Sequence, residues 1–193
     1  GEDLCRKTIR ENRRMGIAHV PEDRNLNGSA PEMSVRDNLI AASLDKLSKG
    51  TILDRKAIED YCEACVEDFR VKTSSLNISI KSLSGGNIQK AIVAREFTAG
   101  ADIIILNQPT RGVDVGAMEF IHKKILEMRD EKKSLILVSA DLAELKALSD
   151  RIIVFHQGTI AGVLDDVPNT TEEELGLYML GLKSDSEEKL KEA

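Results

Sequence analysis

Three features that would direct a protein to a membrane, a secretory route or a nucleic acid are missing from this sequence. No run of apolar residues approaches the roughly 20 that a membrane-spanning helix needs. The acidic start, Gly1 to Cys5, is not followed by a secretory signal. The net charge is -6, whereas domains that bind nucleic acids are usually basic. These absences predict a cytoplasmic chain with no nucleic-acid partner.

A disulfide framework and a metal site are also not expected. The sequence has three cysteines, which cannot all pair, and Cys62-Glu-Ala-Cys65 is the only closely spaced set. That spacing suits a redox or zinc site, but it falls within a helical pattern and has no second pair nearby. We therefore interpret Cys62 and Cys65 as ordinary helix residues. The histidines are scattered through the chain, at His19, His122 and His156.

The order of predicted elements indicates an α/β fold. The first part suggests a helix over 3–14, a strand over 16–20, a loop over 21–31 and a helical insertion over 34–98, with helices that begin after Ser34 and Asp54. The second part suggests buried strands over 101–106 and 134–138, helices over 116–130, 141–147 and 171–182, a hairpin over 151–164 and a charged, mobile tail over 183–193. Buried strands that alternate with helices predict a mainly parallel sheet.

The strongest chemical signal is Leu83-Ser84-Gly85-Gly86-Asn87, which leads into a helix. Glycines let a backbone approach a ligand closely, and a helix start offers unpaired N–H groups and a positive dipole end. The serine hydroxyl adds a donor. This arrangement suits a phosphate group, although on its own it also fits a plain helix-entry turn.

A second signal follows about twenty residues later. The apolar strand that starts at Ile103 ends in the polar sequence Asn107-Gln-Pro-Thr110, and Arg111-Gly-Val-Asp-Val-Gly-Ala117 comes next. Ligands of open α/β sheets bind at the carboxyl ends of the strands. We therefore expect a ligand-binding region around residues 107–117.

The order of these motifs resembles that of the ATP-binding-cassette (ABC) ATPases: signature motif, Walker B strand, D-loop, then the strand before the switch residue. The resemblance extends from Gly16 to about Leu182. Asn87, the loop Val20-Pro-Glu-Asp-Arg24 and the segment 109–117 are similar to the second cassette of simple-sugar importers. Residues 107–111 and 138–142 are similar to the nucleoside-import branch.

The resemblance implies a partial P-loop NTPase core with an inserted helical signature subdomain. Residues 1–182 would form this partial domain, with the helical subdomain at about 34–98 and the RecA-like core in 101–182. The family's Walker A loop is absent, and the chain contains no Gly-Lys dipeptide. We therefore expect a fragment truncated before Walker A. We also expect strand 103–106 to expose an unpaired apolar edge, because the family's neighbouring strand would be missing.

Several catalytic positions of the family are altered here. Asn107 stands at the Walker B aspartate position, and Gln108 replaces the glutamate that would activate water. A neutral amide cannot act as a general base. The switch histidine position is Ala140, and the Q-loop glutamine position is Glu22. Together these changes indicate a degenerate nucleotide site.

In the family, two cassettes pair head to tail, so the resemblance implies that this chain serves its partner's site. Ser84, Gly85, Gly86 and Asn87 would face the γ-phosphate of ATP held by the first cassette, which would also hold most of the Mg²⁺. Asp114 in the D-loop would couple the two sites. Glu22 and the helical insertion would face transmembrane permease subunits at the inner face of the cell membrane. An extracytoplasmic solute-binding protein would act indirectly.

Three alternatives remain open from the sequence. The first is a lobe of a chromosome protein of the SMC type, which also has a signature and a Walker B strand without Walker A. The second is a translation-associated ABC protein, which should be more basic and keep its acidic catalytic pair. The third is a regulatory module that only binds a partner cassette. The sequence that precedes Gly1 would distinguish all three from an importer.

Overall fold

The computed structural model describes residues 3–49, 52–186 and 188. These form two compact units, one over Gly1–Val138 and one over Ser139–Ala193. The first unit contains α1 (Ile9–Arg14), β1 (Ile17–Val20), the π-helical turn η1 (Arg24–Gly28), α2 (Val35–Ile40), β2 (Ser48–Lys49), β3 (Ile52–Leu53), α3 (Arg55–Asp68), the short 3₁₀ turn η2 (Ile80–Ser82), α4 (Gly85–Thr98), β4 (Ile103–Asn107), α5 (Val115–Asp130) and β5 (Ser134–Val138). The second contains α6 (Leu142–Leu148), β6 (Ile152–His156), β7 (Thr159–Leu164) and α7 (Glu172–Met179).

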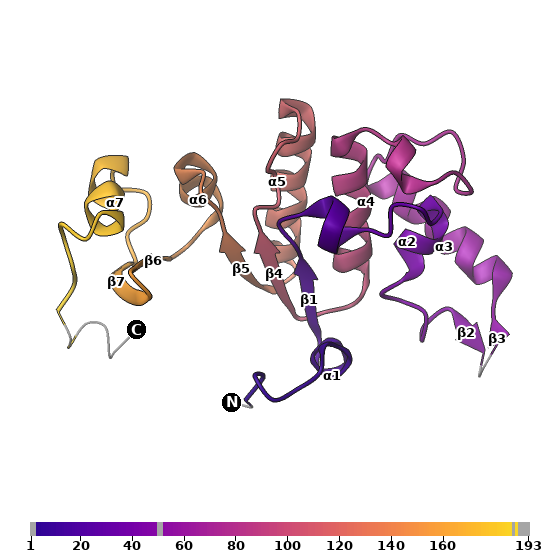
Figure 1. Ribbon diagram of the computed structural model, residues 1–193, viewed down its shortest axis with the longest axis horizontal. Helices are drawn as coiled ribbons and strands as arrows, with labels where there is room; N and C mark the ends of the chain where they lie inside the picture. Colours follow the sequence, from indigo (N-terminus) through magenta and orange to yellow (C-terminus); the bar gives the residue numbers. More distant parts are fainter. Residues whose placement is uncertain (1–2, 50–51, 187, 189–193) are drawn as a thin grey trace. The chain divides into compact units, whose positions relative to one another are not determined.

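The first unit is built on a three-stranded parallel sheet in the order β1-β4-β5 (Figure 1). This confirms the α/β fold and the parallel sheet. The expectation that strand 103–106 would have an unpaired edge is wrong, because β4 is the central strand and pairs with β1 on one side and β5 on the other. The segment 16–20, although short, supplies the missing neighbour.

The two faces of this sheet differ sharply in burial. The register places Ala18 beside Ile104, and Val20 beside Leu106, on one face, and all four side chains are buried. The opposite face includes Ile136 and is largely exposed. Its apolar members are Ile17, Ile103, Ile105, Ile136 and Val138. One side of the sheet therefore forms the core of this unit, and the other presents apolar surface.

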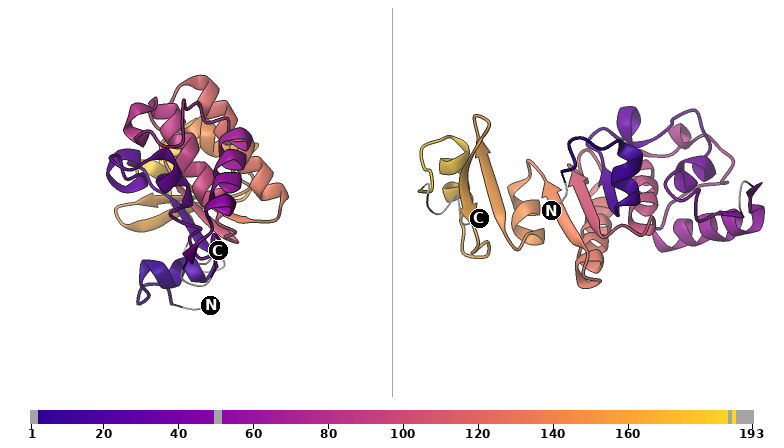
Figure 2. Two further views of the ribbon diagram at one scale, coloured as in Figure 1. Left: turned by 90° about the vertical axis from the view of Figure 1, so that its right-hand side faces the viewer. Right: turned by 90° about the horizontal axis from the view of Figure 1, so that it is seen from below.

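Helix α4 lies between the strands and the helices α2 and α3 of the first unit (Figures 1 and 2). It contacts β1 and α5 on one side and α2 and α3 on the other. Its residues from Ala91 to Phe97 are all buried. This part of the helix is therefore buried around its whole circumference, as expected of a helix with neighbours on several sides.

Buried charges at the carboxyl end of α4 attach α1 to this unit. Glu96 is fully buried and accepts hydrogen bonds from Arg13 Nη1 and Nη2 at 2.9 and 3.0 Å and from Arg95 Nε at 2.8 Å. The backbone N–H of His19 also donates to Glu96, at 3.4 Å. A single carboxylate thus links α1, β1 and α4.

Several predicted helices are shorter in the structure. Helix α1 begins only at Ile9, because Thr8 and Glu11 form a capping box there. The helix after Ser34 ends at Ile40, and a short hairpin of β2 and β3 lies within the predicted helical insertion. The helix after Asp54 has the predicted side-chain cap.

The second unit is an antiparallel hairpin with two helices. The turn between β6 and β7 is made by Gln157 and Gly158, both at positive φ, 48° and 81°, as predicted from the sequence. Helix α7 ends at Met179, and Gly181 follows with a φ of 71°, a conformation that commonly terminates helices. The core of the second unit contains Ile152, Val154, Ala161, Leu164, Val167, Leu175 and Tyr178.

The predicted domain limits are 1–182, with a helical subdomain over 34–98. The division into two units does not test these limits, which remain a prediction. Most of the predicted tail, residues 187 and 189–193, lies outside the described residues. Within the described part of the chain, every helix is too short or too polar to cross a bilayer.

Candidate functional site

The turn over residues 83–87, called the signature turn below, leads directly into α4. Ser84 is the N-cap residue of α4, and its hydroxyl accepts a hydrogen bond from Asn87 Nδ2 at 2.9 Å. Asn87 Oδ1 in turn accepts from the backbone N–H of Lys72 at 2.9 Å. A hydroxyl that accepts one bond still has its own proton to donate, and Ser84 is exposed. Asn87 therefore orients a serine that can donate to a ligand.

Both glycines of the signature turn are in close contact with other segments. A Cβ atom at Gly85 would lie 2.9 Å from Nη2 of Arg24. One at Gly86 would lie 2.9 Å from Oδ2 of Asp114 and 3.1 Å from Cβ of Ala117. Any larger residue would displace these neighbours. The sequence suggested glycine for close approach of a ligand, and packing within the chain supplies a second, independent reason.

Arg24 joins the signature turn to the D-loop segment, residues 111–114. Its Nη1 donates to the carbonyl oxygen of Arg111 at 2.8 Å, and its Nη2 donates to that of Gly112 at 3.2 Å. The Arg111 guanidinium forms an ion pair with Glu22. The Q-loop position and the D-loop are therefore in direct contact, through two arginines that the sequence interpretation did not assign.

The D-loop ends where α5 begins. Asp114 is the N-cap residue of α5, and its Oδ1 accepts from the backbone N–H of Ala117 at 3.0 Å. Deeper in the unit, Gln89 Nε2 on α4 donates to the carbonyl oxygen of Pro109 at 2.7 Å, and this bond is buried. The amino-terminal half of α4 therefore contacts the segment that follows β4 at Pro109 and at Asp114.

Asn107 and Gln108 lie at the carboxyl end of β4, as the sequence predicted. Asn107 pairs with Val138 in the register of β4 and β5. Gln108 has a φ of 51° and donates its backbone N–H to the carbonyl oxygen of Val138 at 2.8 Å. A left-handed backbone at a residue other than glycine costs roughly 1–3 kcal/mol and is concentrated at functional sites. Both side chains are half-buried amides, which carry no charge and cannot take up a proton.

The remaining candidates belong to other elements. Ala140 belongs to the second unit, where it is exposed and directly precedes Asp141, the N-cap residue of α6. Cys62 and Cys65 are buried free thiols on α3. Burial raises the pKa of Cys62 to about 12, which keeps it in the unreactive thiol form. No group of three potential metal-binding side chains occurs among the residues that the structure describes.

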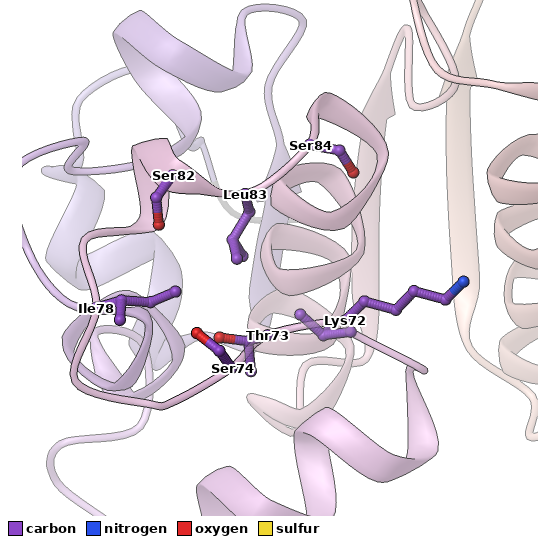
Figure 3. Close-up of a pocket in the computed structure, with 8 residues that line it drawn as sticks. Lys72, Thr73, Ser74, Ile78, Ser82, Leu83 and Ser84 are labelled. Atoms are coloured by element: carbon purple, nitrogen blue, oxygen red, sulfur yellow. The ribbon is translucent and has the colours of Figure 1, made fainter.

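An open pocket of about 530 Å³ adjoins the signature turn. It is lined by Val71, Lys72, Thr73, Ser74, Ile78, Ser82, Leu83 and Ser84. Figure 3 shows Lys72 extending away from the other labelled side chains. Ser84 is thus on an accessible surface rather than in a closed cavity.

The chain is similar in sequence to several import ATP-binding proteins. The chain is 41% identical over 182 residues to the nucleoside import ATP-binding protein NupA of Lactococcus lactis subsp. cremoris, a match that covers 93% of this chain and 36% of that protein. It is 38% identical over 183 residues to the guanosine import ATP-binding protein NupO of Bacillus subtilis, covering 94% of this chain and 36% of that protein. It is also 38% identical to the ribose import ATP-binding protein RbsA 1 of Rubrobacter xylanophilus, covering 89% of this chain and 34% of that protein.

Solved structures show the same fold. A dimeric ATP-binding cassette in a post-hydrolysis state, bound to ADP and Pi, superposes with a TM-score of 0.66 at 21% identity, covering 80% of this chain and 65% of that one. The chain belongs to the ABC ATPases. No family model matches it. The chain spans about a third of the length of the curated relatives that it matches.

The contacts in the structure show which residues the sequence interpretation of this ABC ATPase missed. Glu22 and Asp114 were singled out as separate site residues, but Arg24 and Arg111, which connect their segments, were not. Both arginines lie in segments that carry the family resemblance, Val20–Arg24 and 109–117. Spacing alone does not reveal that segments almost 90 residues apart are in contact.

Proposed function

We propose that this chain is part of the ATP-binding subunit of an ABC importer for sugars or nucleosides. Its partners would be a first cassette and transmembrane permease subunits, with an extracytoplasmic solute-binding protein acting indirectly. It would work at the cytoplasmic face of the cell membrane. The names of the relatives, which describe nucleoside, guanosine and ribose import, support this proposal.

Within such an assembly, the chain would supply its signature turn to ATP that is held by the partner cassette. The observation that carries this proposal is the contrast between the signature turn and the carboxyl end of β4. The residues of the signature turn are held in place: Asn87 orients its serine, and both of its glycines pack against other segments. The carboxyl end of β4, by contrast, presents Asn107 and Gln108 where acids would be needed.

The residues present fit a phosphate group at the signature turn. Ser84 offers a hydroxyl donor, and the start of the 14-residue helix α4 supplies N–H groups and a positive dipole end. ABC ATPases in general use ATP together with Mg²⁺. Hard cations such as Mg²⁺ prefer charged oxygen ligands, so the amides of Asn107 and Gln108 do not fit a metal site on this chain. The nucleotide site built on this chain would therefore be degenerate.

The test uses the complete transporter in liposomes and measures ATP turnover. Replacing Ser84 by arginine removes a preorganised donor and adds bulk, so turnover should fall several hundredfold, because one such donor contributes roughly 10²–10³ in rate. Ser74→Arg is the matched control, since Ser74 is exposed and lines the same open pocket away from the start of α4. Near-normal turnover for the Ser84 variant at equal folded protein would contradict the proposal.

A further inference from the structure

Arg24 occupies an unusual position, because its guanidinium contacts two functional segments at once. It lies against Gly85, where a Cβ would come within 2.9 Å of Nη2 and 3.3 Å of Cζ. The same group donates to the carbonyl oxygens of Arg111 and Gly112. One side chain therefore links the signature turn to the D-loop.

The turn that carries Arg24 is itself held in place. Asp23 caps it by accepting hydrogen bonds from the backbone N–H groups of Asn25 and Leu26, at 2.8 and 3.0 Å. These bonds, first that of Leu26 and then that of Asn25, lower the pKa of Asp23. The carbonyl oxygen of Arg24 accepts from Ser29 Oγ at 2.7 Å. Arg24 is thus presented from a hydrogen-bonded turn.

This turn also packs on α4 farther along the helix. A Cβ at Gly28 would lie 2.8 Å from Cδ1 of Ile92, so turn and helix meet without a gap. Arg24 therefore reaches the D-loop from a base that is anchored to α4. A second contact of the same kind, between Asp114 and Gly86, closes the arrangement from the D-loop side.

We propose that Arg24 is a positioning residue that holds the signature turn and the D-loop in one fixed arrangement, so that both can meet the partner's ATP together. The inference rests on the proposed function. Arginine suits this role because its planar guanidinium donates to two carbonyl oxygens in fixed directions, whereas the ammonium group of lysine is a single point charge.

The first measurement is hydrogen exchange on this 193-residue chain, which needs no assumption about transport. Arg24→Gln should speed amide exchange at least about tenfold in both residues 84–88 and 111–114, with little change in α3 or in the β6–β7 hairpin. Arg129→Gln is the control, because Arg129 is an exposed residue whose described ion pair is with the adjacent Asp130. Unchanged exchange at the two segments, or a change in only one, would overturn the proposal.

A double-substitution cycle tests the contact itself. Gly85→Ala should lower the midpoint of unfolding in the presence of Arg24, because the added methyl group meets the guanidinium. In an Arg24→Ala background, which lacks the guanidinium, Gly85→Ala should lower the midpoint of unfolding much less. Equal costs in both backgrounds would show that Arg24 does not constrain the turn.

The third measurement separates positioning from general instability in the complete transporter. Arg24→Gln should lower kcat for ATP by about tenfold or more and leave KM within about twofold, because displacements of about 1 Å can cost 10²-fold in rate. Arg24→Lys should recover part of the loss. A rise in KM with kcat unchanged would contradict the inference.

Ser84→Arg, measured in parallel, identifies which idea has failed. If Ser84→Arg abolishes turnover and Arg24→Gln does not affect it, the signature turn acts as proposed and Arg24 does not position it. If Ser84→Arg has no effect, the proposed function is wrong. The exchange data on the 193-residue chain would then still decide whether Arg24 couples the two segments structurally.

Discussion

Individual residues in this chain differ in the chemistry that their side chains can offer: some can donate a hydrogen bond to a phosphate group, and others cannot act as an acid or a base. Ser84 retains a donor on an exposed turn. Asn107 and Gln108 keep the shape of acids but not their charge. An amide is nearly isosteric with a carboxylate, so the fold tolerates it, whereas proton transfer does not. The backbone at Gln108 is left-handed, with a φ of 51°, a conformation that is concentrated at functional sites.

This contrast predicts that Gln108→Ala has little effect on activity. A neutral residue already stands at this position, so ATP turnover of the complete transporter should stay within about twofold. The measurement is turnover in liposomes at matched folded protein, beside Ser84→Arg. A collapse in the Gln108 variant would mean that this chain's own site, rather than its signature turn, carries the chemistry.

At the scale of elements, α4 determines how the first unit is assembled. Its amino-terminal half contacts Arg24, Pro109 and Asp114, and its carboxyl-terminal half contains the buried Glu96. One helix therefore supports both the candidate site and the attachment of α1.

The sequence predicted the elements better than their contacts. Buried strands and the Gln157-Gly158 hairpin follow from local patterns, because turn geometry and apolar runs are short-range properties. The pairing of β4 with β1 was missed, because four residues starting at Ile17 gave no sign of which strand they would join. The bonds from Arg24 to the D-loop were missed for the same reason, since they join distant segments.

The buried carboxylate of α4 gives a stability prediction. Glu96→Gln keeps the volume but leaves the side chains of Arg13 and Arg95, which are 37% and 10% exposed, without their counter-charge. Removing one partner of a buried ion pair typically costs about 3–5 kcal/mol. We expect about 3 kcal/mol here, because Arg13 is partly solvated. Denaturant unfolding followed by circular dichroism measures the loss.

Arg13→Gln should lower the free energy of unfolding less than Glu96→Gln does, because Arg95 would still neutralise the carboxylate of Glu96. Glu63→Gln is the control, since Glu63 is exposed on α3 and should change the free energy of unfolding by less than about 0.5 kcal/mol. Equal stabilities of the Glu96 and Glu63 variants would show that the buried network contributes nothing.

At the scale of the whole chain, the first unit exposes one apolar face of its sheet. Ile136 and Val138 on β5 are 52% and 49% exposed. Exposed apolar patches of this kind promote association. We expect concentration-dependent self-association of the 193-residue chain, and Ile136→Lys should reduce it. Sedimentation velocity over a tenfold concentration range measures this; a monomer at all concentrations, with or without the substitution, would contradict the prediction.

The last prediction concerns ATP itself. The phosphate-binding loop of P-loop proteins cradles phosphates with backbone N–H groups and a lysine, and the sequence has no Gly-Lys dipeptide to form one. The signature turn alone offers one hydroxyl and the start of α4, which is too little to hold a nucleotide. The 193-residue chain should therefore show no measurable ATPase activity and only negligible ATP affinity, weaker than about 1 mM.

Isothermal titration with Mg-ATP tests this directly, and Ser84→Arg should give the same flat titration as the unchanged chain. Micromolar binding that Ser84→Arg abolishes would show that the turn binds nucleotide without a partner cassette. Micromolar binding that Ser84→Arg leaves intact would place a nucleotide site elsewhere on this chain.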